Sequence, residues 1–405
     1  MEIKENFMLS ERMTRVTESA TMKIAAETIR LKSEGIDIIN LGVGEPDFNT
    51  PEFVKDAAKQ AIDDNKTHYT LTRGIKILRE SISKRLKKDF DVEFSADEII
   101  VTNGAKQAIF NIILAMINHD DEVIVPTPCW PTYMELIHIA GGVPVKLKTD
   151  VSMDFKITPE QLKKAITPKT KAILFSNPSN PTGMVYSKSE LEKLVQTLRE
   201  SGIFVFSDEI YGKLVFDNFD FVSLATYREY LNNKLVLFQG ASKAYAMTGW
   251  RLGFAAGPKE VINACNTIQG HSTSNVATIS QHAALAAFDG DQDIVDRMRD
   301  AFEERRNFVT DYLKTIKGLS FTKPEGAFYV FPEIKSFYGI APDGSEIRNS
   351  TDLTMYLLQN AHVAVVPGLG FEAEDYIRIS YAASMEQLEQ GLSQIKDALE
   401  KIRTN

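Results

Sequence analysis

Short, almost entirely apolar segments recur along the middle of the chain, and stretches with helical periodicity separate them. The apolar segments are residues 98–102, 122–125, 172–175, 204–206 and 235–238. Strands buried on both faces have this character, and helices between such strands favour parallel pairing. The pattern predicts an α/β fold with a large domain whose mostly parallel central sheet is covered by helices.

The two ends of the chain have a different pattern. Residues 14–33 have helical spacing, and a short apolar segment follows at 36–42. After residue 289 the chain is charged and helical over 291–316, then apolar at 327–331 and 363–366, and it ends in an amphipathic helix from Ser384. We predict a smaller α+β domain formed by both termini. The predicted parts are an N-terminal arm that contributes to the small domain (1–50), the large domain (51–289) and the rest of the small domain (290–405).

Composition and charge exclude several classes of protein. The 405 residues carry a net charge of −9 and no dense block of Lys and Arg, which argues against a nucleic-acid partner. The cysteines, Cys129 and Cys265, lie far apart, and the six histidines have no metal-binding spacing, so we expect no metal site. Residues 1–7 lack the apolar core of a signal peptide, and no apolar run reaches membrane-spanning length. These features predict a cytoplasmic protein with no membrane partner.

Chemically useful residues follow each predicted strand. They lie in residues 102–106, 126–130, 176–183, 207–211 and 240–253. In open α/β sheets, ligands bind beyond the carboxyl ends of the strands. We therefore expect these five segments to meet at one edge of the sheet and to form a single site.

Two of these segments suit pyridoxal phosphate, which needs an amine for a Schiff base, an acid beside its pyridinium nitrogen and a phosphate site. Lys243 offers the amine among small residues. A free lysine has a pKa of about 10.4, so the site must favour the neutral amine. Asp208 directly follows an apolar strand, where burial is costly unless a cation faces the carboxylate. An aspartate in this place also commonly caps a helix, and Glu209 is a competing carboxylate.

Other residues on the same strand ends suit the ring of this cofactor. Tyr211 and Asn180 can hydrogen-bond the ring phenolate and favour its ionised form. Trp130 offers a flat face for stacking on the pyridine, although a tryptophan here is equally typical of core packing.

The phosphate is expected at the start of the helix that follows residues 98–102. Gly104, Ala105 and Lys106 would present backbone N–H groups there, and Arg251 can add a bidentate clamp. A rival motif, the glycine pair Gly42 and Gly44, lacks the third glycine of a dinucleotide fingerprint, because Asp47 stands in its place.

Several ordered blocks of the sequence resemble the class I aminotransferases, which are fold-type-I pyridoxal phosphate enzymes. The blocks are residues 240–253, 177–183, 207–211, 41–48, 66–69, 326–329 and 378–381. The similarity extends from about Thr21 to the C-terminus and is greatest to the bacterial aspartate aminotransferase branch. The resemblance implies the fold-type-I architecture.

The resemblance also implies roles for individual residues. Lys243 would carry the Schiff base and move the substrate proton, while Asp208 would keep the pyridinium protonated. Arg378 would hold the substrate α-carboxylate as a fork, with the backbone of Gly44 nearby. Tyr69 would reach the cofactor phosphate of a neighbouring subunit, which predicts a homodimer with shared active sites. Tyr211 is included among the catalytic residues, and Trp130 and Asn180 among those that contact substrate.

Two departures from the family pattern affect these expectations. Some members carry a serine three residues before the lysine, where this chain has Gly240, so Ser242 is expected to compensate. One aspartate aminotransferase branch uses a partner-subunit arginine for the distal carboxylate, but residues 266–281 contain no Arg or Lys. Lys106 is therefore our candidate for the distal carboxylate.

These features predict ping-pong transamination between an L-amino acid, with aspartate favoured, and a 2-oxo acid such as 2-oxoglutarate. Alternatives with the same fold are an aminotransferase for aromatic amino acids, prephenate or alanine, and a pyridoxal phosphate lyase. An alternative of another class is a cofactor-binding regulator without activity. The presence of Lys243 and the absence of an added DNA-binding segment argue against this last alternative.

Overall fold

The computed structural model describes residues 9–16 and 21–404. The N-terminal stretch 1–7, expected to lack a signal peptide, lies outside the described residues, as does part of the helix expected at 14–33. The described parts of that region form a 3-10 turn, Glu11–Thr14, and the helix α1, Thr21–Ser33.

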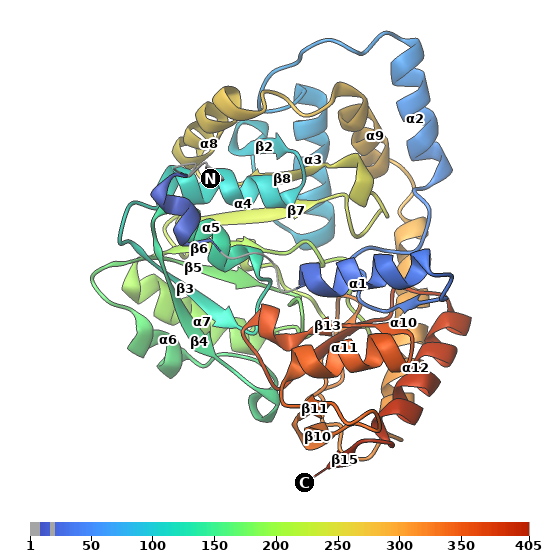
Figure 1. Cartoon of the computed structure of the whole chain (residues 1–405). Helices are drawn as coiled ribbons and strands as arrows, with labels where there is room; N and C mark the ends of the chain where they lie inside the picture. Colours follow the sequence, from blue (N-terminus) through green and yellow to red (C-terminus); the bar gives the residue numbers. More distant parts are fainter. Residues whose placement is uncertain (1–8, 17–20, 405) are drawn as a thin grey trace, which may run out of the picture.

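A seven-stranded sheet forms the centre of the molecule, in the order β2-β8-β7-β6-β5-β3-β4 (Figure 1). Its strands are β2 (Ile99–Thr102), β3 (Glu122–Thr127), β4 (Val143–Lys148), β5 (Thr170–Ser176), β6 (Phe204–Asp208), β7 (Leu235–Gly240) and β8 (Gly253–Ala256). Within this sheet β8 runs antiparallel to both of its neighbours, β2 and β7. The remaining strand pairs are parallel. The predicted mostly parallel sheet is therefore confirmed.

Two strands of this sheet were not predicted. β4 lies at the edge and alternates exposed with partly buried residues, so it lacks the all-apolar character of a central strand. β8 is built from Gly253, Phe254 and two alanines, which form a weak strand signal. Tertiary pairing with β2 and β7 overrides that local preference.

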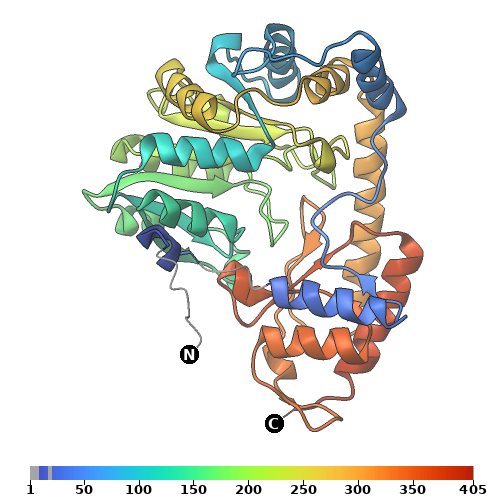
Figure 2. The same ribbon diagram turned by 45° about the horizontal axis from the view of Figure 1, so that its top comes forward.

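Helices cover both faces of the sheet (Figure 2). Along β7 the side chains alternate: Leu235 and Leu237 join one hydrophobic core, and Val236 and Phe238 join the other. The first core is completed by α2 (Glu52–Asp63), α3 (Lys76–Phe90), α6 (Pro159–Ala165), α7 (Lys188–Ser201) and α9 (Thr278–Asp289). The second is completed by α4 (Ala105–Met116), α5 (Thr132–Ala140) and α8 (Lys259–Ser272).

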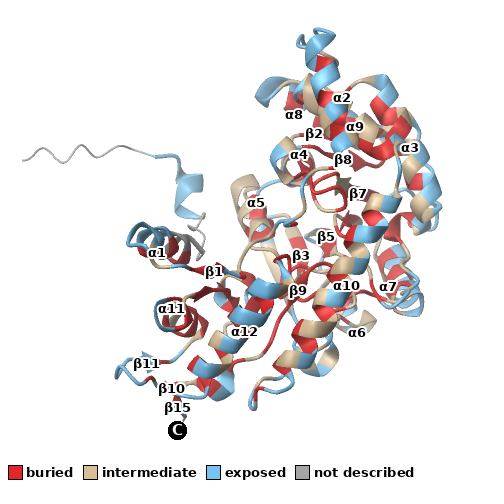
Figure 3. Cartoon of the chain, turned by 90° about the vertical axis from the view of Figure 1, so that its right-hand side faces the viewer, coloured by how far each residue is buried: buried red, intermediate tan, exposed pale blue. Residues whose placement is uncertain are grey.

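The C-terminal elements form a further core, which α10 (Asp293–Leu313) connects to the sheet region (Figures 1 and 3). Its other helices are α11 (Ser350–Asn360) and α12 (Met385–Leu399). Its strands are β9 (Tyr329–Val330), β10 (Gly339–Ile340), β11 (Glu346–Ile347), β12 (Val363–Ala364), β13 (Val366–Pro367), β14 (Ile377–Ser380) and β15 (Arg403–Thr404). The helix predicted from Ser384 begins there, because this serine caps α12 through a capping box.

The N-terminal segment joins this C-terminal core. β1 (Ile39–Asn40) pairs in parallel with β12, and α1 contacts α11 (Figures 1 and 3). The side chains of Ile39 and Leu41 are buried among C-terminal residues. Both ends of the chain therefore contribute to one α+β unit, as the fold class predicted.

The terminal strands are shorter than predicted. Regular pairing covers two residues in β1, β9, β12 and β13, although the apolar segments that contain them are longer. Ala327 has a φ of 60°, which breaks the extended conformation before β9. β14, which carries Arg378, was not predicted as a strand. Across the described residues, no helix combines the length and apolar character needed to cross a bilayer.

Candidate active site

A cavity of about 1010 Å³ lies at the carboxyl end of the sheet, between the sheet and the C-terminal core. One side, here called the sheet wall, contains Gly104, Ala105, Lys106, Trp130, Asn180, Asp208, Tyr211, Ser242, Lys243 and Arg251. The other side, the terminal wall, contains Gly42, Gly44, Tyr329, Val366 and Arg378. Apart from Tyr69, each residue that the sequence nominated for the site lines this cavity.

Lys243 lies in the turn that follows β7 and reaches into the cavity. Its ammonium donates a hydrogen bond to the carbonyl oxygen of Gly44, across the gap between the two walls. Burial lowers the pKa of Lys243 to about 8, and the positive charges of Arg378 and Arg251 act in the same direction. Glu45 and Asp208 oppose this shift. The amine is thus partly neutral near physiological pH, as nucleophilic and base chemistry require.

Asp208 ends β6, and its carboxylate lines the cavity. Its Oδ2 accepts a hydrogen bond from the Tyr133 hydroxyl at 2.6 Å, and its Oδ1 accepts one from the Ile210 N–H at 3.1 Å. Burial raises the pKa of Asp208, while these two hydrogen bonds and Lys243 lower it. No α-helix follows directly, so Asp208 caps a turn and not a helix. A cation placed in the cavity would stabilise the ionised carboxylate.

Glu209, the competing carboxylate, does not line the cavity. Its Oε1 accepts hydrogen bonds from the Ser207 hydroxyl at 2.8 Å and the Leu224 N–H at 2.9 Å. Consecutive residues at a strand end point to opposite faces, which explains why only one of the two carboxylates faces the cavity. Of the two carboxylates, only Asp208 is placed to meet a ligand.

Tyr133 is a site residue that sequence reasoning missed. It lies in the first turn of α5, three residues after Trp130, and the two rings meet edge to face with centroids 5.5 Å apart. Its hydroxyl is buried against Asp208, and burial raises its pKa well above the usual value. The spacing of three places both aromatic residues on one side of a helical turn, which was the available signal.

Residues 104–106, here called the phosphate corner because the sequence predicts the phosphate site there, lie beside Arg251 in the structure. Ala105 begins α4, and Gly104 has a φ of 79°. A Cβ added to Gly104 would lie 2.7 Å from Nη2 of Arg251, so the guanidinium lies directly over the helix N-terminus. Arg251 also donates from Nη1 to the Thr248 carbonyl at 2.9 Å. Free N–H groups and a guanidinium facing one point form an anion site.

Lys106 lies beside this corner, with its ammonium 4.8 Å from the centroid of the Trp130 ring. Burial and the nearby charge of Arg251 lower the pKa of Lys106. Both Lys106 and Trp130 line the cavity, so the cation is available to an anionic group of a ligand.

Gly240, where some family members carry serine, pairs with Gly253 across β7 and β8. A Cβ at Gly240 would lie 2.7 Å from Cα of Gly253 and 2.8 Å from the carbonyl oxygen of Leu252. Backbone atoms cannot move aside as a flexible side chain can, so no serine fits at this position.

Ser242 is buried and lines the cavity, where its hydroxyl is available to a ligand.

Arg378 projects from β14 into the terminal wall. Its Nη1 donates to Asn180 Oδ1 at 3.0 Å, and its Nη2 donates to the Gly42 carbonyl at 2.8 Å. Each terminal nitrogen carries a second N–H that these two bonds do not use. The guanidinium also lies 4.3 Å above the ring of Tyr329, whose hydroxyl is 2.8 Å from that of Tyr211. The arginine is thus held as a fork that can bind a carboxylate.

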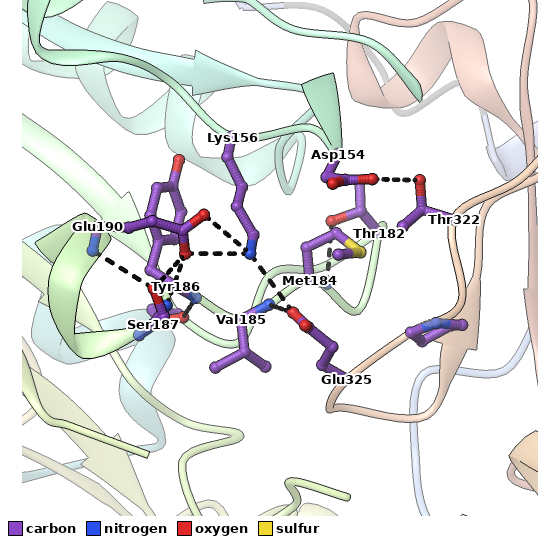
Figure 4. A network of polar contacts seen from close by, with 12 residues as sticks. Asp154, Lys156, Thr182, Met184, Val185, Tyr186, Ser187, Glu190, Thr322 and Glu325 are labelled. Carbon is purple, nitrogen blue, oxygen red and sulfur yellow. Dashed lines mark hydrogen bonds and ion pairs between the residues drawn. The ribbon is translucent and has the colours of Figure 1, made fainter. Parts of the chain in front are cut away.

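A polar network joins residues 185–190, which follow the Asn180 turn in the sequence, to Lys156 and Glu325 (Figure 4). Lys156 lies between two carboxylates, with its Nζ 3.2 Å from Glu190 Oε2 and 3.6 Å from Glu325 Oε2. Glu325 also accepts a hydrogen bond from the Val185 N–H at 3.1 Å. The network attaches the Asn180 turn to the segment that leads into Tyr329, and sequence reasoning did not find it.

Tyr69 does not reach the cavity of its own chain. It lies between α2 and α3 with 92% of its surface exposed. Its expected contact with the phosphate of a neighbouring subunit stays a prediction. Across the part of the chain that the structure covers, no group of three or more His, Cys, Asp or Glu residues is arranged to hold a metal ion.

Comparison with protein-family models matches residues 36–395 to the family described as Aminotransferase class I and II. The chain belongs to this family. Among relatives of this aminotransferase, an aspartate aminotransferase of Geobacillus stearothermophilus is 43% identical and covers 97% of this chain and 99% of its own length. A probable aspartate/prephenate aminotransferase of Rickettsia bellii is 42% identical over 96% of this chain and 98% of its own length.

Solved structures of aminotransferases have the same fold. The crystal structure of the aspartate aminotransferase from Rhizobium meliloti superposes with a TM-score of 0.95 at 40% identity and covers 98% of this chain and all of its own. The Thermus thermophilus aspartate aminotransferase with maleate gives a TM-score of 0.90 at 38% identity, with 97% of this chain covered and 100% of that one. The predicted family and fold are confirmed.

Proposed function

We propose that this aminotransferase uses pyridoxal phosphate to exchange an amino group between L-aspartate and a 2-oxo acid such as 2-oxoglutarate. The observation that carries the proposal is the meeting of Lys243, Asp208 and Arg378 in one cavity, with the pKa of Lys243 lowered to about 8. A reactive amine, a buried carboxylate and an arginine fork are the groups that this chemistry requires of the protein.

The residues of the sheet wall fit the cofactor. The N-terminus of α4 with Arg251 and Ser242 would hold the phosphate, and the buried carboxylate of Asp208 would pair with the pyridinium nitrogen. Trp130 would stack on the ring, and Tyr211 with Asn180 would hydrogen-bond its phenolate. When bound, this cofactor would supply an aldehyde carbon that accepts and returns the amino group and an electron-withdrawing ring that stabilises the electrons released at the substrate Cα.

The protein groups would bind and orient the substrate around that ring. Arg378, held by Asn180 and Gly42, would bind the α-carboxylate with its two outward N–H groups, near the backbone of Gly44. Lys243 would remove the proton from the substrate Cα and return a proton in the second half of the reaction. Lys106, above Trp130, would bind the distal carboxylate of aspartate.

The proposal extends to the assembly. Tyr69 is a large side chain that no part of its own site uses, and it would complete the phosphate corner of a second copy in a homodimer. We also propose the division into an arm (1–50), a large domain (51–289) and a C-terminal small domain (290–405), which would function together in the cytoplasm. Its partners would be small amino and oxo acids.

A panel of amino donors against 2-oxoglutarate tests the proposal. We expect the purified protein to absorb at the edge of the visible region, to lose that band when aspartate is added, and to prefer aspartate to alanine and phenylalanine. Absence of the band would refute cofactor use, and preference for phenylalanine would refute the assignment of aspartate. Prephenate belongs in the acceptor series, because relatives are named for both activities.

A further inference from the structure

A second, much smaller void lies beside the ends of β6 and β7, and Ile210 lines both this void and the large cavity. Its volume is about 20 Å³, which is the space that one water molecule needs. Its lining combines aromatic and apolar side chains with five charged or amide residues, which are Arg85 and Asp89 of α3, Glu209, Lys213 and Gln239. The large cavity is not lined by Arg85, Glu209 or Gln239.

Three polar atoms of these residues are buried without a hydrogen-bond partner in the part of the chain that the structure describes. They are Nε of Arg85, Nε2 of Gln239 and Oε2 of Glu209. In two of these side chains another polar atom is hydrogen-bonded. Arg85 Nη2 donates to Asp89 Oδ1 at 2.5 Å, and Glu209 Oε1 accepts hydrogen bonds from the Ser207 hydroxyl and the Leu224 N–H. Unpaired buried polar atoms are rare in folded proteins, and three of them belong to residues that line one void, which points to a group that bridges them.

The hydrogen-bond capacities of the three atoms identify that group. Arg85 and Gln239 each present a donor. Burial raises the pKa of Glu209 to about 7, and above that pH its ionised carboxylate presents an acceptor. A water molecule accepts two hydrogen bonds and donates one or two, so it satisfies the whole set. A chloride ion would meet the carboxylate of Glu209, and a metal cation would meet the charge of Arg85. Asp89 and Lys213 also line the void, but they already pair with each other at 2.8 Å. We propose that the void is a binding site for one water molecule that accepts hydrogen bonds from Arg85 and Gln239 and donates one to Glu209.

This water connects three elements that support the sheet wall. Glu209 directly follows Asp208, and Gln239 directly precedes Gly240, from which the Lys243 turn begins. The Glu209 N–H also donates to the Phe238 carbonyl at 3.0 Å, so the ends of β6 and β7 already touch at this place. The bridge adds α3 to that contact. Glu209 is therefore a positioning residue, which acts on the cofactor through Asp208.

The first test is a crystal structure of the cofactor-loaded protein at high resolution, grown in bromide. We expect a single density peak within hydrogen-bonding distance of all three atoms and no anomalous signal from bromine. An empty void, a direct contact between Arg85 and Glu209, or a bromide peak would each overturn the proposal.

The second test exchanges the donor and acceptor. In Glu209→Gln, the side-chain NH2 group must point either toward the Leu224 N–H or toward the void. Both places already hold N–H donors, so the NH2 group meets another donor in either orientation. We expect the melting temperature of this variant to fall by about 2–4 °C. The double variant Glu209→Gln with Gln239→Glu restores one acceptor and two donors around the water. Its melting temperature should therefore return most of the way to the wild-type value. An unchanged melting temperature in the single variant, or no recovery in the double, would contradict the site.

A test of the positioning role of Glu209 requires a measurement that a loss of stability alone would not change. We expect Glu209→Gln to weaken the visible circular dichroism of the bound cofactor, and the double variant to restore it. Tyr356→Phe is the matched control: it removes a buried hydrogen bond to the Ala398 carbonyl within the C-terminal core. It should lower the melting temperature and leave the visible band unchanged. An unchanged band in Glu209→Gln would refute the positioning role.

Discussion

The sheet wall and the terminal wall of the cavity are built differently, and the sheet wall carries three cations, Lys106, Lys243 and Arg251, where the terminal wall carries Arg378. Lys243 and Asp208 stand at the ends of β7 and β6, which pair over four or more residues in the middle of a seven-stranded sheet. Arg378 stands on β14, whose pairing with β9 and β13 covers two residues on each side. Asn180 and the Gly42 carbonyl hold its guanidinium in place. Backbone pairing therefore fixes one wall, and side-chain bonds between distant segments fix the other.

This difference separates the expected consequences of mutation. A change on the sheet wall should alter how the cofactor is held or how protons move, because those groups are fixed to the sheet. A change on the terminal wall should alter how the substrate is held and leave the cofactor unaffected. The carbonyl of Gly44 and the ammonium of Lys243 form a direct contact between the two walls.

The largest effect is expected at Lys243. Lys243→Ala removes the group that moves the substrate proton, and general acid–base catalysis of this kind contributes about 10²–10⁴-fold. We expect kcat to fall by that factor, and reduction with borohydride should no longer attach the cofactor to the chain. Lys259→Ala is the control, because Lys259 lies on α8 outside the cavity. Turnover at the wild-type rate in Lys243→Ala would refute the mechanism.

Arg378→Lys should affect KM, whereas Lys243→Ala should affect kcat. A lysine keeps the positive charge but cannot present two parallel N–H groups to a carboxylate. Loss of one charge-assisted hydrogen bond of about 1.5–3 kcal/mol corresponds to a KM for aspartate higher by about 10–10²-fold. The visible band of the cofactor should not change. If kcat fell and the band shifted while KM stayed constant, the proposed separation between the walls would be wrong.

Substitution of Lys106 tests whether the sheet wall also contributes to substrate specificity. Lys106→Met keeps an apolar stem over Trp130 and removes the charge, so kcat/KM for aspartate should fall by about tenfold while that for alanine is unchanged. Lys106→Arg should retain most of the preference for aspartate. Equal losses for the two amino acids would show that Lys106 does not bind the distal carboxylate.

The smallest effect concerns the electrostatic coupling of the two walls. In cofactor-free protein, acylation of Lys243 should increase with pH through a midpoint of about 8, because the neutral amine is the reactive form. Arg378→Leu removes a positive charge that lowers the pKa of Lys243, so the midpoint should move to higher pH. Peptide mass spectrometry follows the modified lysine, with the exposed Lys259 as internal reference. A wild-type midpoint near the free-lysine value of about 10.4 would contradict the burial effect.

The two walls also differ in what the sequence could predict. Lys243, Asp208 and the Gly104–Lys106 corner lie at or just after the ends of segments that are almost entirely apolar, so strand ends and ligand chemistry could be derived from residue types. Arg378 could be placed only through the resemblance to a family, because β14 and its partners are too short to produce a periodic signal. The contacts that hold it join residues 198 and 336 positions apart in the sequence, which local patterns do not encode.

Other residues escaped prediction because their roles depend on burial. Tyr133 has the sequence appearance of a core aromatic, and only its hydrogen bond to Asp208 shows a role at the site. The choice between Asp208 and Glu209 likewise required the structure, because both carboxylates follow the same strand. Lys156 and Glu325 form their network between segments that are far apart in sequence.

The close approach of Gly240 to Gly253 has a consequence for protein engineering. A Cβ at Gly253 would lie 2.3 Å from the Ala105 nitrogen, so the start of α4, the end of β7 and the start of β8 lie close together through their backbones. In a saturation-mutagenesis library these two glycines should be as intolerant as Lys243, although neither lines the cavity. Transplanting the serine of other family members to position 240 would therefore require a shift of the Leu252–Gly253 backbone at the start of β8 and not a single substitution.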